Sequence, residues 1–187
     1  SSLGVSCFTS KDLKSWKNHG LVLPVSNEPG SDIEGGCIIE RPKVLYNKKT
    51  KKFVMWFHLE LKGKGYAAAR YGVATSDTPF GPFKFVRSGR VNPGIYPVGF
   101  AKPDTTDLKH QLLFPELKNW WTPEWRKQIE RGMFWMRDFA GGQMSRDMTI
   151  FIDDDGKAYH IYSSEDNLTL QIAQLTDDYM QHNGSYV

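Results

Sequence analysis

The sequence of 187 residues has few cysteines, no long apolar run and little net charge, and each shortage excludes a class of protein. Cys7 and Cys37 are too few for a disulfide scaffold or a four-cysteine zinc site, and leave either one bridge or free thiols. No apolar run approaches the roughly 20 residues that a membrane-spanning helix needs. The net charge of +3 is too small and too dispersed to indicate a nucleic-acid partner.

The composition that remains, 40% hydrophobic and 13% aromatic residues, is that of a globular protein. The ends of the chain are less ordinary. It begins without a methionine or a signal sequence, shortly before the strand-like segment 4–9, and it ends directly on Tyr186 and Val187. Because a complete domain usually has slack at its ends, we expect the chain to be a fragment of a longer protein.

Two segments repeat a strand–turn–strand pattern that predicts antiparallel hairpins. The first covers 43–58 and turns through a run of lysines, and the second covers 148–162 and turns through 153–156. An Asp-Gly turn between β-branched and aromatic residues is a strong hairpin signal. We interpret the three aspartates of the second turn as a solvated turn, because a calcium site needs several more oxygen ligands.

A second hairpin follows each of the first two, so that four antiparallel strands form one unit, the unit of a β-propeller blade. The sequence therefore predicts an all-β fold that is part of a β-propeller. It divides into the outer half of a blade (1–24), a blade (about 38–90), an insertion (91–143) and a blade (144–187). An antiparallel sandwich is the alternative, and the matching four-strand order favours the propeller.

The insertion is expected to be ordered and partly helical. A short helix is predicted from Pro123 to Arg131, with proline near its start and Gly132 just past its end. Trp121 and Trp135 are two of its four tryptophans. Tryptophan faces stack on sugar rings, but they also pack loops against a sheet, and the sequence leaves both interpretations open.

Carboxylates and arginines precede the first strand of each predicted blade. Glu40 and Arg41 lie before one of these strands, and Arg146 and Asp147 before the other. First strands line the central channel of a propeller, so these side chains should converge at its mouth. Paired carboxylates are what hydrolysis of a glycosidic bond needs: one protonates the leaving oxygen and another activates water. A structural ion pair that pins a loop is the alternative.

Histidines in the predicted strands offer weaker candidates. His58 and His160 lie in apolar strands, where a core or channel-wall histidine is a simpler interpretation than a zinc ligand. A sugar is oriented by a few polar groups in its pocket, and His58, Arg41, Arg146 and Glu165 are candidates for that part.

Several motifs resemble glycoside hydrolase family 43. The resemblance covers nearly the whole chain, and it looks strongest toward the branch that contains the exo-β-1,3-galactanases. The motifs are Cys37–Asn47 with its Glu-Arg-Pro-Lys-Val core, Met55–His58, Val73–Asp77 with Gly81–Phe83, and Ser145–Thr149 with Asp153–Gly156 and Ser163–Glu165.

The resemblance implies a five-bladed propeller that cleaves O-glycosidic bonds of a plant-type polysaccharide with inversion, without a cofactor or a metal. It gives Asp147 the part of the aspartate that tunes the acid's pKa and positions substrate. It gives Glu40 a base-like or substrate-binding part. Substrate binding would involve Arg41, Arg146, His58, Glu165, Trp121 and Trp135. An oligo- or polysaccharide substrate implies export to the periplasm or outside the cell.

The chain departs from the family pattern at both ends. The base aspartate of the family would precede Ser1, and the Glu-Ala-Pro-like motif of the general acid would follow Val187. Five blades need roughly 300 residues, so the segment alone is expected to be inactive. An α-L-arabinofuranosidase or β-xylosidase of the same family is the alternative activity. A carbohydrate-binding propeller without catalysis is the alternative of another class.

Overall fold

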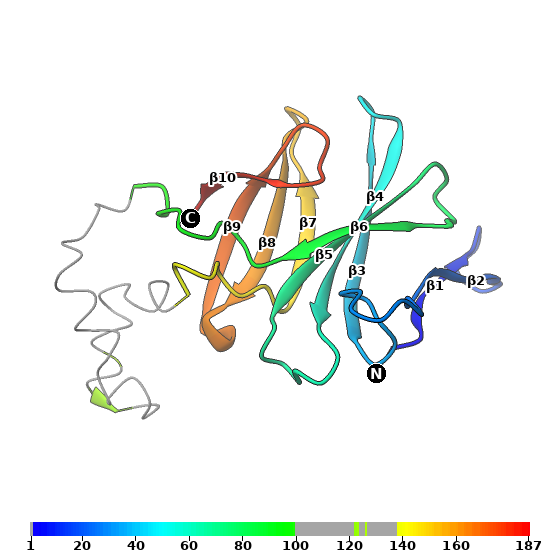
Figure 1. Cartoon of the computed structure of the whole chain (residues 1–187). Helices are drawn as coiled ribbons and strands as arrows, with labels where there is room; N and C mark the ends of the chain where they lie inside the picture. Colours follow the sequence, from blue (N-terminus) through cyan, green and yellow to red (C-terminus); the bar gives the residue numbers. More distant parts are fainter. Residues whose placement is uncertain (1, 100–121, 124–125, 127–137) are drawn as a thin grey trace.

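The computed structural model describes residues 2–99, 122, 123, 126 and 138–187, and the strands in this part form three antiparallel sheets (Figure 1). The two-stranded sheet consists of β1 (Gly4–Thr9) and β2 (Lys17–Pro24). The second sheet consists of β3 (Ile38–Asn47), β4 (Lys52–Glu60), β5 (Arg70–Ser76) and β6 (Lys84–Gly89). The third consists of β7 (Met148–Ile152), β8 (Ala158–Ser164), β9 (Thr169–Leu175) and β10 (His182–Tyr186), with the 3-10 helix η2 (Glu165–Asn167) between β8 and β9.

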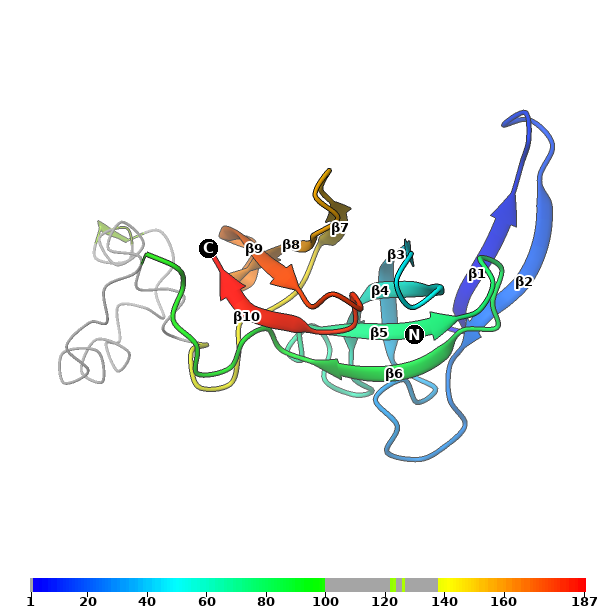
Figure 2. The same cartoon turned by 90° about the horizontal axis from the view of Figure 1, so that it is seen from above.

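Each four-stranded sheet is a meander in which every strand pairs with the next one along the chain. Figure 2 shows the three sheets following one another along an arc, with β3 and β7 on one side of it and β6 and β10 on the other. This is the arrangement of successive propeller blades, and the β1–β2 pair has the size of half a blade. The all-β, partial-propeller fold predicted from the repeats is confirmed.

Most of the predicted helix lies outside the described residues. Of the range 123–131, only Pro123 and Arg126 are described, and Trp121 and Trp135 also lie outside the described residues. Within the described part of the chain, no helix is long and apolar enough to cross a membrane.

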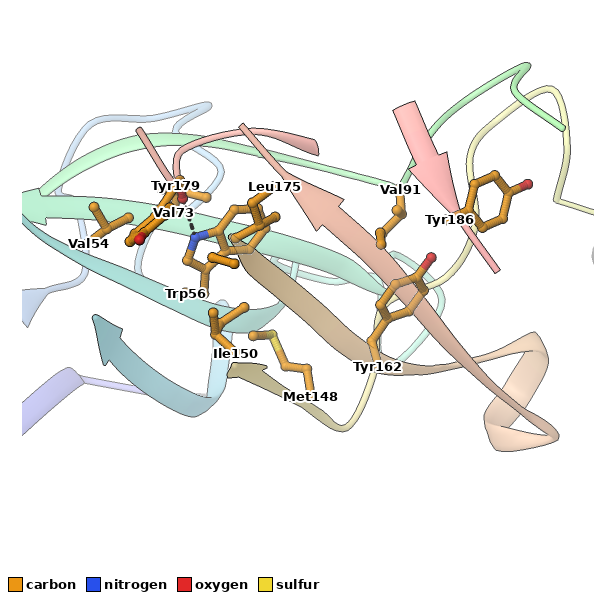
Figure 3. Packing of buried hydrophobic residues seen from close by; sticks show 12 residues of the cluster. Val54, Trp56, Val73, Val91, Met148, Ile150, Tyr162, Leu175, Tyr179 and Tyr186 are labelled. Atoms are coloured by element: carbon orange, nitrogen blue, oxygen red, sulfur yellow. Dashed lines mark hydrogen bonds between the residues drawn. The ribbon is translucent and has the colours of Figure 1, made fainter. Parts of the chain in front are cut away.

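Strand β4 lies at the centre of the packing because both of its faces are covered. Successive side chains of a strand point to opposite faces, so Trp56 and Phe57 enter different cores. Trp56 packs with residues of the β7–β10 sheet, including Ile150 and Leu175, and its indole N–H donates to the Tyr179 carbonyl at 2.7 Å (Figure 3). The opposite core, toward β1 and β2, is formed by Val5, Val22, Leu23, Ile33, Cys37, Ile39, Met55, Phe57, Leu59, Ala74 and Phe83.

The two cysteines are free thiols, which decides between the alternatives that the sequence left open. Cys7 is half-buried, and Cys37 is fully buried in the core between β1–β2 and the second sheet. Burial raises the pKa of the Cys37 thiol, because the thiolate would lose its hydration. Cys37 therefore behaves as a small apolar core residue.

Candidate active site

The beginnings of β3 and β7 meet, as the blade arrangement predicts, and an ion pair joins them. Arg41 Nε donates to Asp147 Oδ1 at 3.0 Å, and both side chains are more than half exposed. Arg41 lies in a β-bulge between Glu40 and Lys43, where its φ of 54° is in the left-handed region. A bulge turns a side chain away from its regular direction, and here it coincides with the contact to the neighbouring sheet.

Glu40 has a hydrogen-bonding partner at each carboxylate oxygen. Tyr66 Oη donates to Oε1 at 3.0 Å, and Nδ1 of His58 lies 3.2 Å from Oε2. The hydrogen bond to Glu40 raises the pKa of Tyr66, because it favours the protonated phenol. With 39% of its side chain exposed, Glu40 is fixed in orientation and still open to solvent.

Arg146 connects the loop between β4 and β5 to the turn after β8 through hydrogen bonds. One of its terminal nitrogens donates to the Tyr66 carbonyl and to Asp166 Oδ1, both at 2.9 Å. Its backbone N–H donates to the Ser163 carbonyl, and the N–H of Ser163 donates to the carbonyl of Asp147. The loop that carries Tyr66 is thus attached to both sheets.

His58 lies beneath Glu40 and is almost completely buried, with 2% of its side chain exposed. Its second ring nitrogen, Nε2, is 2.9 Å from Oε1 of Glu60, a carboxyl group that has no exposure at all. The structure therefore places His58 between two carboxyl groups rather than at the surface. It connects to the open end of the site through Glu40.

Glu165 is also buried, with 1% exposure, in a turn of unusual backbone geometry. Glu165, Asp166 and Asn167 have consecutive φ values of 52°, 59° and 69°, all in the left-handed region that favours glycine. Burial raises the pKa of Tyr162 and of Tyr186, and the nearby negative charge of Glu165 raises both further. Glu165 therefore belongs to the interior at the end of β8, and its neighbour Asp166 reaches Arg146.

The predicted site residues thus fall into three groups. Glu40, Arg41, Arg146 and Asp147 come together at one end of the two sheets, His58 and Glu165 are buried behind them, and the positions of Trp121 and Trp135 lie outside the described residues. Tyr66 and Glu60 were not predicted from the sequence. Tyr66 lies in a loop with no strand pattern, and Glu60 is the last residue of β4, where a carboxylate is ordinarily solvated.

His160, the other histidine of the sequence analysis, lies apart from this group. Its Nδ1 is 3.0 Å from Nε2 of His182, and its ring packs against Trp56 in the core between the two four-stranded sheets. Burial lowers the pKa of both histidines, that of His182 to about 3. Both imidazoles are neutral near pH 7, as a core interpretation of His160 predicts.

Comparison with known proteins gives matches among solved structures. No family model and no curated protein matches the sequence. The chain is 61% identical to a β-1,3-galactosidase of glycoside hydrolase family 43 solved with galactodeoxynojirimycin, with a TM-score of 0.89 over 97% of this chain and 52% of that one. It is 34% identical to an exo-β-1,3-galactanase from Clostridium thermocellum, with a TM-score of 0.68 over 97% of this chain and 30% of that one. An α-L-arabinofuranosidase from the same organism, at 20% identity and a TM-score of 0.53, shares the fold.

Adjacent blades carry carboxylate and arginine side chains at the starts of their first strands: Arg146 and Asp147 precede β7 as predicted, whereas Glu40 and Arg41 lie within β3 and not before it. Taken with these matches, this arrangement defines the chain as part of a propeller of the glycoside hydrolase class. The chain belongs to glycoside hydrolase family 43, and this confirms the family predicted from the motifs. It spans about half the length of the β-1,3-galactosidase that it matches.

Proposed function

We propose that this chain contributes two blades and part of the substrate pocket to an exo-acting β-1,3-galactanase that works with inversion. The observation that carries the proposal is the ion pair between Arg41 and Asp147, which brings Asp147 of one sheet to the residue next to Glu40 in the neighbouring sheet. The likeness to β-1,3-galactosidases and galactanases supports the choice of sugar and linkage. The proposed division of the chain is half a blade in 1–24, blades in 38–90 and 144–187, and an insertion in 91–143.

In this proposal, Asp147 tunes the proton donor and positions the sugar. Its carboxylate is exposed and accepts a hydrogen bond from Arg41, so it stays an acceptor while a sugar hydroxyl approaches. Glu40 has the base-like or substrate-binding part. An inverting enzyme needs a carboxylate that directs water to the face of the sugar opposite the leaving group. The fixed and partly exposed carboxylate of Glu40 suits either part.

The other residues predicted to bind substrate differ in how far they are exposed to solvent. Arg41 is open to solvent and can donate to a sugar hydroxyl directly. Arg146, His58 and Glu165 are largely enclosed, and we assign them to holding the pocket in shape. Trp121 and Trp135 remain proposed stacking surfaces for sugar rings. A polysaccharide substrate implies a protein that works in the periplasm or outside the cell.

Hydrolysis of defined oligosaccharides by the full-length protein tests the proposal. Incubation with β-1,3-galactotriose should release galactose from the non-reducing end, and proton NMR of the first product should show the α-anomer. Arabinofuranosyl and xylosyl nitrophenyl glycosides serve as matched substrates and should react much more slowly. Binding of the trisaccharide without any turnover would contradict the enzyme assignment and favour a carbohydrate-binding propeller.

A further inference from the structure

The buried carboxyl group of Glu60 has a partner at each oxygen. Oε1 lies 2.9 Å from Nε2 of His58, and Oε2 accepts the backbone N–H of Ala69 at 2.9 Å. Glu60 and His58 are two positions apart on β4 and therefore point to the same face. A buried carboxyl group is costly, and apolar residues of similar size often stabilise a core at least as well. The two specific contacts therefore indicate that this carboxyl group holds other groups in position.

Both contacts lead to Glu40. The first runs through the imidazole, since Nδ1 of His58 is the atom that faces Glu40. The second runs through the loop between β4 and β5, because Ala69 ends this loop and Tyr66 on it donates to the other oxygen of Glu40. The Ala69 carbonyl in turn accepts the N–H of Ser145, two residues before Asp147. Glu60 thus supports both groups that contact the carboxylate of Glu40.

The number of hydrogen bonds among Glu40, His58 and Glu60 limits where their side-chain protons can lie. Each ring nitrogen of His58 faces a carboxyl oxygen, and each contact needs one hydrogen, so Glu40, His58 and Glu60 hold two side-chain protons among them. Glu40 is the more exposed carboxyl group and also receives the phenol of Tyr66, whereas Glu60 is fully buried. The negative charge is therefore better placed on Glu40, and the second proton belongs to the contact between His58 and Glu60.

We propose that Glu60 is a positioning residue that keeps Nδ1 of His58 protonated and aimed at Glu40, so that Glu40 stays an ionised and oriented carboxylate. This inference rests on the proposed function only for the part that Glu40 plays. The proton arrangement is a property of the folded chain and can be measured without substrate. Glu60→Gln should preserve it, because the amide can donate to Nε2 and accept from Ala69. Glu60→Leu should remove it.

Nitrogen-15 NMR of the histidine side chains tests the arrangement in the full-length protein. We expect a proton on Nδ1 of His58 in the wild type and in Glu60→Gln, and loss of this single state in Glu60→Leu. Hydrolysis of β-1,3-galactotriose should stay within about threefold for Glu60→Gln and fall at least tenfold in kcat/KM for Glu60→Leu. Gly72→Ala, which disturbs the other face of β4, serves as the control for lost stability and should leave the His58 signals in place.

Each result bears on the proposal. An unprotonated Nδ1 in the wild type overturns it, even if Glu60→Leu fails to fold. Unchanged His58 signals and unchanged turnover in a folded Glu60→Leu protein overturn it as well. A wild type that hydrolyses no galactan while Nδ1 is protonated refutes the proposed function and leaves the positioning of Glu40 by Glu60 supported.

Discussion

Arg41 and Asp147 are separated by 106 residues in the chain, and their side chains meet at 3.0 Å across the gap between two sheets. A second ion pair, between Lys49 and Asp177 at 2.9 Å, joins the same sheets at the opposite end of their strands. Both pairs are more than half exposed, and they differ in what surrounds them. Only the first adjoins Glu40, so comparing them separates a functional contact from a structural one.

Asp147→Asn should lower turnover of β-1,3-galactotriose by about 100-fold or more, because the amide cannot carry the charge that tunes and positions the reacting groups. The free energy of unfolding should change by less than about 1 kcal/mol, since exposed ion pairs contribute little. Kinetics and urea unfolding of the full-length protein measure both. Asp177→Asn is the matched control and should keep full turnover. Wild-type turnover by Asp147→Asn would refute the assignment of this residue.

Tyr66→Phe should lower kcat/KM by roughly tenfold or more, because a hydrogen bond to a charged carboxylate contributes about 1.5–3 kcal/mol. The variant removes the phenol that donates to Glu40 and leaves the ring in place. Tyr46→Phe is the control, since Tyr46 is similarly exposed, at 45% against 48%, and lies at the far end of β3. Equal kinetics for the two variants would mean that the phenol of Tyr66 does not support Glu40.

The sheets could be predicted from the sequence because their signals are local. An alternation of apolar residues and an Asp-Gly turn specify the β7–β8 hairpin without reference to the rest of the chain. The repeat of this unit then indicates the blade. The convergence of Arg41 and Asp147 also followed from the blade arrangement, because the first strands of successive blades lie side by side.

The partners of Glu40 could not be predicted, because they depend on one extra residue. Up to Lys43 the β3–β4 register runs regularly from the turn, and continued unchanged it would place Glu40 opposite Leu59. The bulge at Arg41 shifts the register by one and places Glu40 opposite His58. A one-residue shift exchanges the two faces of a strand, so the bulge decides whether Glu40 meets a leucine or a histidine. Bulges of this kind have no dependable signature in a single sequence.

Gly72→Ala should destabilise the fold by about 1–3 kcal/mol through overpacking. Gly72 on β5 lies opposite Phe57, and a Cβ atom there would be 2.1 Å from Cε2 of that ring. A lower midpoint of urea unfolding measures the effect. Gly35→Ala is the control, because a Cβ at Gly35 meets nothing within 4 Å, and it should unfold at the wild-type midpoint. An unshifted midpoint for Gly72→Ala would show that Phe57 can move aside without loss.

The histidine pair between the two four-stranded sheets should make stability depend on pH. Burial lowers the pKa of His160 and of His182 in the folded protein, whereas an unfolded histidine has a pKa of about 6.5. Below that pH the unfolded chain binds protons that the folded protein does not, so the free energy of unfolding falls as pH decreases. The fall is at most about 1.4 kcal/mol per pH unit for each histidine, and at pH values well above 7 these histidines add no pH dependence because they are neutral in both states.

Urea unfolding between pH 7.5 and pH 5 measures this fall in a window where the paired carboxylates Asp77 and Asp177, whose pKa values are lowered by lysines, stay ionised. His182→Gln keeps a hydrogen-bonding partner for His160 and removes one titrating group, so the slope should drop by the share of one histidine. Gly72→Ala should lower stability by the same amount at every pH. A slope that His182→Gln leaves intact would mean that His182 is protonated in the folded core, contrary to the burial that the structure gives it.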